Sequence, residues 1–251
     1  MTKLLKLTAE NIKSEHICCA ISDKKCASGY EAKKEWIKNQ LKDGYVFIKL
    51  DVRGKVFIEY VPAEKAWVPV EAPGYMMINC FWVSGQYKGQ GHGKELLEAC
   101  LKDTHNLNGI VTVTSEKKQP FLSDKGFFKK QGFVKCDQAA PWFELWYLPL
   151  KSDAPTPKFK DCARNAVCDI PNGLAVYYTN ACPFTEYYVE ELKQIAVKKG
   201  YPIHIVKLET PEQAQNHFVP HTIYSVFLNG KFITQHILNE NYFDKFIPAI
   251  H

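Results

Sequence analysis

The chain has 251 residues and a net charge of +5, and 46% of its residues are hydrophobic and 24% charged. This composition excludes a disordered chain, and no apolar run approaches the ~18 residues of a membrane span. Nine cysteines without CxxC pairs indicate neither a zinc site nor a disulfide framework. We therefore expect a soluble, cytoplasmic protein of one or two domains, without metal, membrane or nucleic acid as partners.

The first 83 residues predict a strand, two helices and three further strands. Apolar residues at helical spacing mark the helices, and β-branched or alternating runs mark the strands. The expected elements are a strand at 4–7, helices at 8–21 and 30–44, strands at 45–51 and 55–61, a Pro-rich loop at 62–74 and a strand at 75–83.

The next elements complete a first domain at about residue 150. We expect a helix from Gly91 to Thr104, a strand at 109–114, a helix at 121–132 and two final strands. This order is typical of a mixed α/β domain with a largely antiparallel sheet.

A second, smaller domain follows a linker. Residues 151–173 contain three prolines and no strong periodicity, which predicts a linker between domains 1–150 and 174–251. Beyond it the pattern restarts, with a strand at 174–179, a helix at 183–200, a strand at 202–208, a helix at 211–218, a hairpin at 222–237 and a closing helix.

A glycine-rich turn, VSGQYKGQGHGK, joins strand 75–83 to the following helix. Such a turn presents backbone N–H groups and the positive end of the helix dipole, which together bind an anion such as a phosphate. A simple bend is the alternative. The nucleotide loops fail on spacing: Gly93-Lys94 is followed by Glu95 where a P-loop has Ser or Thr, and Lys94 stands at the third glycine position of a dinucleotide fingerprint.

A family pattern fits this stretch better. The run FWVSGQYKGQGHGKELLEAC resembles the acetyl-CoA motif of the GNAT acetyltransferase superfamily, with Lys88 in place of the usual Arg or Gln, followed by Gly91 and Gly93. The run FFKKQGF resembles the late helix of that superfamily with its Gly-Phe pair. The resemblance implies the α+β GNAT fold, with a mixed, mostly antiparallel sheet, for residues 1–150.

The resemblance extends to the second domain. The run IEYVPAEKAWVPVEAPGYMMINC, joined to a C-terminal module of this kind, resembles the YoaP-type acetyltransferases, whose C-terminal part is thioredoxin-like. It implies a smaller thioredoxin-like α/β domain at 174–251. It also implies acetyl-CoA as co-substrate and direct acetyl transfer to an amine of a small molecule or peptide.

The resemblance assigns cofactor-binding residues. The pantetheine-binding strand corresponds to Phe81, Trp82 and Val83, and strand alternation places Asn79, Phe81 and Val83 on one face. The superfamily's usual acid, a Tyr, is replaced by Phe128. The pyrophosphate-binding turn corresponds to Lys88, Gly89, Gln90, Gly91, His92, Gly93 and Lys94.

The catalytic candidates are polar residues on the strands at 55–61 and 75–83 and in the Pro-rich loop between them. Glu59 and Glu71 are candidates for the base or for amine recognition, with a solvated surface carboxylate as the alternative for each, and Asn79 is a candidate to orient a water.

The C-terminal module carries one candidate redox residue. NACPFTEYYVEEL resembles the thioredoxin active-site turn, with Thr185 in place of the second cysteine, and we expect the helix N-terminus to lower the pKa of Cys182. Pro220 resembles the thioredoxin cis-proline. The alternatives are an inert module that shapes the acceptor site or a dimer contact, and, for the whole chain, a thiol oxidoreductase or a non-catalytic CoA sensor.

Overall fold

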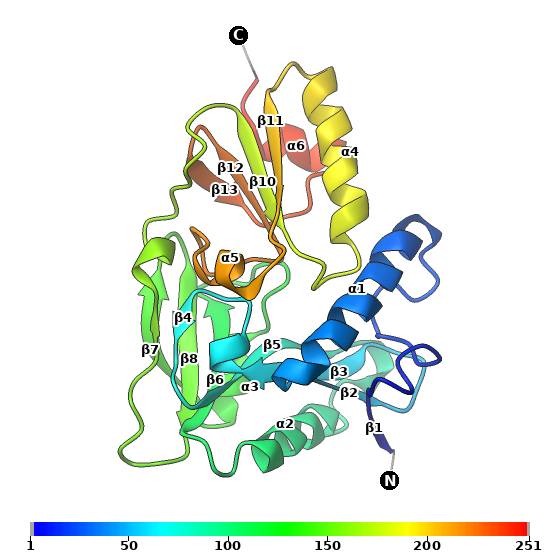
Figure 1. Cartoon of the computed structure of the whole chain (residues 1–251), viewed down its shortest axis with the longest axis vertical. Coiled ribbons are helices and arrows are strands. Elements are labelled where there is room, and N and C mark those ends of the chain that lie inside the picture. Colours follow the sequence, from blue (N-terminus) through cyan, green and yellow to red (C-terminus); the bar gives the residue numbers. More distant parts are fainter. Residues whose placement is uncertain (1–2, 250–251) are drawn as a thin grey trace.

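A seven-stranded sheet forms the centre of the N-terminal part in the computed structural model, which describes residues 3–249 (Figure 1). Its strand order is β1-β2-β3-β5-β6-β8-β7, and within the described chain its neighbouring strands run antiparallel apart from the parallel pair β5 and β6. The expectation of a mixed, mostly antiparallel sheet is confirmed. The strands are β1 Leu4–Lys6, β2 Val46–Leu50, β3 Val56–Pro62, β5 Tyr75–Val83, β6 Gly109–Ser115, β7 Val134–Ala139 and β8 Phe143–Pro149.

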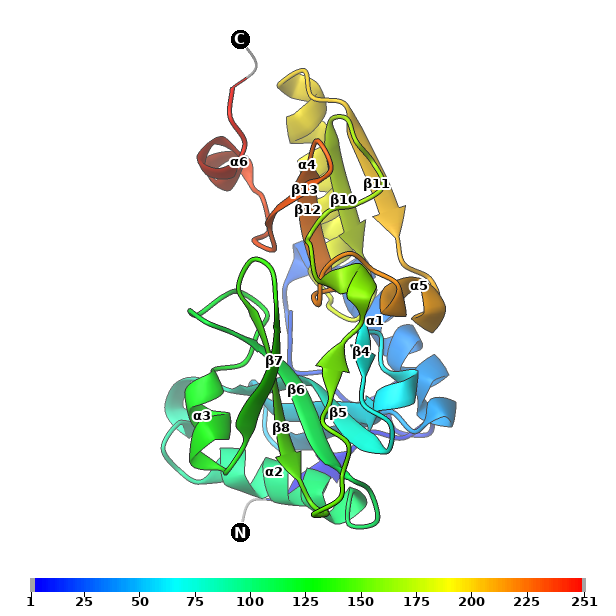
Figure 2. The same cartoon turned by 90° about the vertical axis from the view of Figure 1, so that its left-hand side faces the viewer.

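Helices cover both faces of this sheet. Helices α2 and α3 lie on one face, where Leu96 and Phe128 join the core, and helix α1 lies on the other with Trp36 and Ile37 buried (Figures 1 and 2). The helices are α1 Ala27–Gln40, α2 His92–Asp103 and α3 Lys125–Lys130, with 3-10 turns η1 Lys24–Cys26, η2 Leu41–Asp43, η3 Ala63–Lys65 and η4 Gly85–Tyr87. No helix within residues 3–249 is long and apolar enough to cross a lipid bilayer.

The C-terminal module is a second sheet of order β11-β10-β12-β13 with helices α4, α5 and α6. Strand β10 runs parallel to β11 and antiparallel to β12, which forms a hairpin with β13. Within the described residues, the element order predicted for the C-terminal part is therefore confirmed. The bounds are β10 Leu174–Tyr178, α4 Thr185–Lys198, β11 Ile203–Lys207, α5 Pro211–Gln215, β12 Tyr224–Leu228, β13 Lys231–Thr234 and α6 Glu240–Phe246.

The segment 151–173 contacts both parts of the chain. Strand β9, Lys158–Phe159, pairs with β4, Val70–Glu71, and is followed by the turn η5, Asp161–Ala163. Val167 forms a bridge to Lys231 of the C-terminal hairpin. Phe159 and Phe227 belong to one continuous hydrophobic core, so the C-terminal module is packed against the same face of the large sheet as α1 (Figure 2).

The helix predicted at 8–21 is wrong, and the helix predicted at 121–132 is too long. Residues 8–21 form turns: the Thr8 and Asn11 side chains accept each other's backbone N–H groups, and Cys18, Ala20 and Ser22 have positive φ angles, which an α-helix does not admit. The helix predicted at 121–132 begins only at Lys125, because Phe121 is also left-handed (φ +64°) and the side chain of Asp124 caps the helix.

The alternation predicted along β5 is wrong beyond its middle. Glu59 of β3 faces Cys80, while the next residue, Tyr60, faces Ile78, so Asn79 is the extra residue of a β-bulge. One extra residue reverses the alternation. Phe81 and Val83 therefore lie on the α2 face with Ile78, and Cys80 lies on the α1 face.

Candidate functional site

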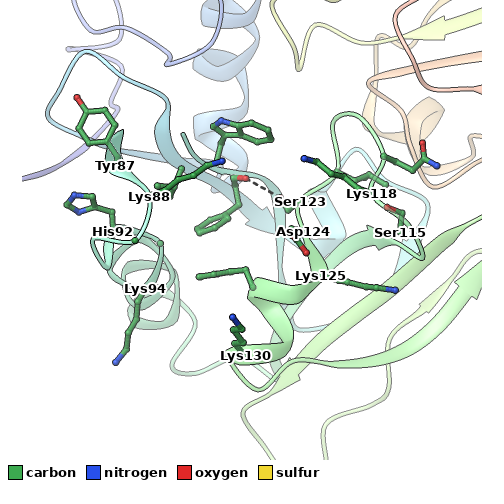
Figure 3. Close-up of a pocket in the computed structure, with 18 of the residues that line it drawn as sticks. Tyr87, Lys88, His92, Lys94, Ser115, Lys118, Ser123, Asp124, Lys125 and Lys130 are labelled. Carbon is green, nitrogen blue, oxygen red and sulfur yellow. Dashed lines mark hydrogen bonds between the residues drawn. The ribbon is translucent and has the colours of Figure 1, made fainter. Parts of the chain in front are cut away.

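The sheet opens between β5 and β6. The two strands pair from Tyr75–Ile78 to Gly109–Thr112, and then β5 continues along β3 while β6 continues along β8. The bulge at Asn79 marks the point where they separate. A cavity of ≈ 740 Å³, which we call the lysine cleft, fills the opening between the end of β5, the glycine turn and the loop before α3 (Figure 3).

The three alternate glycines of the turn have two different roles. Gly89 and Gly91 have φ angles of +77° and +86°, in the left-handed region that glycine adopts without strain. Gly93 is helical, but a Cβ there would lie 3.1 Å from Phe127 Cε2 and 3.3 Å from Phe81 Cζ. Two glycines therefore form the turn, and the third lets α2 pack closely against β5 and α3.

The turn leaves the N-terminus of α2 open to the cleft. Gly91 is the N-cap without a side-chain cap, and within residues 3–249 no backbone N–H from residue 89 to 93 donates a hydrogen bond to the protein. Lys88 and Lys118 extend into the cleft from opposite sides, whereas Lys94 points away (Figure 3) and lies 3.8 Å from Glu98. Open N–H groups at a helix start, beside lysines, are an arrangement that can bind an anion.

The other predicted cofactor residues lie around this cleft, with one exception. Phe81, Trp82 and Val83 line it, and Trp82 is 44% exposed. His92 lines it as the first residue of α2, buried, with Nδ1 3.1 Å from Glu95 Oε2. Gln90 faces solvent, and its side chain donates to the Gln86 carbonyl at 2.5 Å.

A second, smaller cavity lies between the large sheet and the C-terminal module. This inner chamber of ≈ 50 Å³ has walls from α1, β3, β5 and β6 and from Tyr45 just before β2, together with the segment 220–223 of the C-terminal module. Leu122 and Ser123 line both cavities, so the chamber and the lysine cleft meet there. The Ser123 hydroxyl donates to the Phe81 carbonyl at 3.2 Å, which ties the loop before α3 to the end of β5.

A buried ionic network forms one wall of the inner chamber. Lys33 Nζ lies 2.6 Å from Glu59 Oε1, both side chains are 2% exposed, and the Tyr45 hydroxyl donates to Glu59 Oε2. Burial and the Glu59 carboxylate raise the pKa of Tyr45 well above its usual value. Burial alone lowers the pKa of Lys33, but the Glu59 carboxylate, together with the nearby sulfur atoms of Cys19, Cys80 and Cys182, outweighs this effect and the net pKa is raised. The alternative that Glu59 is a solvated surface carboxylate is therefore excluded.

The remaining catalytic candidates lie in different places. Asn79 lines the chamber against the Tyr45 hydroxyl, beside Glu59. Glu71 is a surface residue of β4, and its carboxylate lies 2.9 Å from Lys158 Nζ. Within residues 3–249 the structure brings Glu71 to neither cavity. Phe128, at the position of the usual acid, is fully buried against Phe81 and Phe133.

Two expectations for the C-terminal module are wrong, namely a lowered pKa of Cys182 and a cis peptide bond before Pro220. Burial raises the pKa of Cys182 to about 12, because the turn is packed beneath α1, where Gly29 approaches the carbonyl of Pro183. Cys182 is therefore a thiol and not a thiolate at neutral pH. The cis peptide bond found within residues 3–249 precedes Pro141, so the bond before Pro220 is trans.

Several chamber residues gave no signal in the sequence. Trp36 occurs on an ordinary amphipathic helix, Tyr45 directly precedes a strand, and His221 occurs in a loop. A lysine on the apolar face of helix 30–44 was the one available hint, since a buried lysine requires a partner.

The chain has relatives along its whole length. Residues 10–133 match the family model described as Acetyltransferase (GNAT) family, and residues 202–245 match the model described as YoaP-like. The Bacillus subtilis (strain 168) protein named "Uncharacterized N-acetyltransferase YoaP" is 41% identical over 248 residues, which cover 98% of each chain.

Similar solved structures cover the N-terminal part. A GNAT family acetyltransferase from Brucella melitensis in complex with acetyl-CoA is 16% identical, with 62% of this chain and 92% of that chain covered and a TM-score of 0.39. The acetyltransferase YhbS from Escherichia coli in complex with CoA is 13% identical, with 64% of this chain and 90% of that chain covered and a TM-score of 0.39.

Proposed function

Since the chain belongs to the GNAT acetyltransferase family, we propose that it transfers the acetyl group of acetyl-CoA directly to an amine. The observation that carries this proposal is the opening between β5 and β6, which leads to an uncapped helix N-terminus beside lysines. An opened sheet provides unpaired backbone along β5 for an extended amide chain, and the α2 N-terminus provides donors for a pyrophosphate.

The residues around the lysine cleft fit the parts of acetyl-CoA. We assign the pantetheine arm to Phe81, Trp82 and Val83, and the pyrophosphate to the backbone of 88–94 with the side chain of Lys88. Lys118 adds positive charge from the opposite wall. The acetyl thioester then reaches the end of the cleft at Leu122 and Ser123, where the inner chamber begins.

The chemistry is an acyl transfer without a covalent enzyme intermediate. The amine nitrogen attacks the thioester carbonyl carbon, a C–N bond forms, and the C–S bond breaks as the electron pair leaves on sulfur. We assign proton removal from nitrogen to the Tyr45 oxygen, with Tyr45 passing its own proton to Glu59. Asn79 orients the Tyr45 hydroxyl. The thiolate takes its proton from solvent in the open cleft.

The C-terminal module is proposed to be thioredoxin-like in fold but not in chemistry. Its order β11-β10-β12-β13, with β10 and β11 parallel, supports the assignment. The raised pKa of Cys182 and the Thr185 that replaces a second cysteine disfavour a dithiol reaction. All nine cysteines are free within residues 3–249, which supports a reducing compartment such as the cytoplasm.

The proposal is tested by amine-dependent release of CoA. Purified protein is incubated with acetyl-CoA and single amines, free thiol is measured, and the acetylated product is identified by mass spectrometry. We expect release that requires an amine and falls at least a hundredfold in Glu59→Gln. Full activity in Glu59→Gln excludes the Tyr45–Glu59 route, and the absence of any acetyl-CoA binding excludes the function.

A further inference from the structure

The inner chamber contains polar atoms that the protein does not satisfy. Within residues 3–249, Trp36 Nε1 and His221 Nε2 are buried and have no hydrogen-bond partner in the protein, and both residues line the chamber. Their exposed fractions are 9% and 3%. Buried donors and acceptors are nearly always paired, so two unpaired ones at a single cavity indicate a ligand that pairs with them.

The chemistry of these atoms constrains the ligand. The indole N–H of Trp36 is only a donor, so it requires an oxygen or other acceptor on the ligand. Burial lowers the pKa of His221 to about 3, so its ring is neutral and Nε2 can accept a hydrogen bond from an N–H group. The Tyr45 hydroxyl, which donates to Glu59, can receive a second N–H.

The charge of the chamber constrains the ligand further. Glu59 is compensated by Lys33, and His221 is neutral, so the walls carry no net charge. The rest of the lining is largely aromatic and aliphatic, with Trp67 and Phe121 among it. A carboxylate or a second ammonium group would enter without a counter-ion, which is costly in a buried site.

The size of the chamber favours a small ligand. A volume of ≈ 50 Å³ corresponds to roughly three to five water-sized groups, since one such group needs about 10–15 Å³ on this measure. A long polyamine, an aminoglycoside or a folded peptide loop does not fit. An amine with a few further atoms does.

We propose, on the basis of the function proposed above, that the inner chamber is the acceptor site and that its acceptor is a small primary amine bearing one uncharged oxygen. Trp36 binds that oxygen, while His221 and Tyr45 bind the amine. The C-terminal module therefore supplies a wall of the acceptor site and one of its specificity-determining residues.

Contacts between the two parts of the chain hold this wall in place. The Thr222 hydroxyl donates to the Trp67 carbonyl at 2.6 Å, and Gln235 donates to the Pro120 carbonyl at 2.6 Å. The His221 ring stacks on Phe121, with ring centroids 5.7 Å apart. The module thus fixes both His221 and the loop that leads to Ser123, at the point where the chamber meets the lysine cleft.

The first test compares acceptors of different size and charge. Glycinamide and ethanolamine each carry one amine and one uncharged oxygen, glycine carries a carboxylate, and spermidine and a lysine-containing octapeptide are long. We expect kcat/KM at least tenfold higher for glycinamide or ethanolamine than for the other three. A preference for spermidine, the peptide or glycine overturns the inference, as does the failure of both small probes in protein that binds acetyl-CoA.

The second test removes each recognition atom and keeps the ring. Trp36→Phe and His221→Phe are each expected to raise the KM of the better small probe by roughly five- to tenfold, with kcat and the KM of acetyl-CoA nearly unchanged. Trp146→Phe is the control, because it removes an indole N–H that bonds Glu144 outside both cavities. An unchanged amine KM in both chamber variants overturns the inference and leaves the proposed function intact. If the wild-type protein does not bind acetyl-CoA, the proposed function itself is wrong.

Discussion

Replacing Lys33 by Met tests whether the buried network supports both stability and chemistry. The Lys33 ammonium is the counter-ion of Glu59, 2.6 Å away, and both side chains are 2% exposed. Met retains most of the apolar stem, whose charged end lies over the Phe47 and Phe57 rings, with Nζ 5.7 Å and 5.9 Å from their centroids. The substitution therefore removes the charge and leaves most of the packing unchanged.

The magnitude follows from the burial of the carboxylate that remains. Removing one partner of a buried ion pair costs about 3–5 kcal/mol, because the other charge stays desolvated. Here Tyr45 still donates to Glu59, so we expect about 3 kcal/mol. In the double variant Lys33→Met/Glu59→Gln no unpaired charge remains, and we expect a loss of only about 1–2 kcal/mol. Glu59→Gln leaves the Lys33 ammonium buried without its counter-ion and is expected to cost at least about 1 kcal/mol, so the coupling free energy is at least about 2 kcal/mol.

Urea unfolding at pH 7 of the wild type, both single variants and the double variant measures this cycle. The m-values must agree among the four proteins for the comparison to hold. A coupling free energy below about 0.5 kcal/mol would refute the reasoning, because it would mean that Lys33 and Glu59 are hydrated in solution.

Three further predictions concern the glycine turn and the buried titratable groups. Gly93→Ala places a Cβ 3.1 Å from Phe127 Cε2, so we expect a lower Tm and an acetyl-CoA Kd raised several-fold by calorimetry; an unchanged Tm and Kd would contradict the close packing. Cys182→Ser is expected to retain acetyl transfer. The folded pKa of Cys182, about 12, lies above the unfolded value near 9. The free energy of unfolding of the wild type, measured in urea, should therefore fall by about 1 kcal/mol relative to that of this variant between pH 9 and 10. If the free energies of the two proteins change equally with pH, burial of the thiol is disproved. The folded pKa values of His217 and His221, about 3, lie below the usual 6.5, so their stabilisation is present above pH 6.5 and lost as the pH falls. Between pH 7.5 and 5, the free energy of unfolding of His221→Phe should therefore fall by about 2 kcal/mol less than that of the wild type in urea unfolding. Equal decreases would show that the His221 ring is exposed.

Local patterns in the sequence predicted most of the elements. The apolar strand at 75–83 and the hairpin before it occur at the predicted places, because β-branched and aromatic runs bounded by turn residues are found mainly in strands. The helix predicted at 8–21 failed since its apolar residues are buried through turns with positive φ angles, which spacing alone does not show. The bulge at Asn79 is likewise one extra residue in an unbroken apolar run.

The cleft was predictable and the chamber was not. The glycine turn is contiguous in the sequence, so its spacing and flanking lysines indicated an anion site directly. The chamber combines Trp36, Tyr45, Glu59 and His221, which are up to 185 positions apart and meet only when the C-terminal module packs on the sheet. Glu59 resembles a surface residue on its strand, and only the position of Lys33 on α1 explains its burial.

Titration calorimetry with acetyl-CoA tests the central claim most directly, with NAD and ATP as comparison ligands. We predict one acetyl-CoA per chain with a Kd in the micromolar range, weakened at least tenfold by Gly91→Val, which strains a residue at φ +86°, and much weaker binding of NAD and ATP. Absence of acetyl-CoA binding, or equal binding of all three ligands, would contradict the assignment of the lysine cleft.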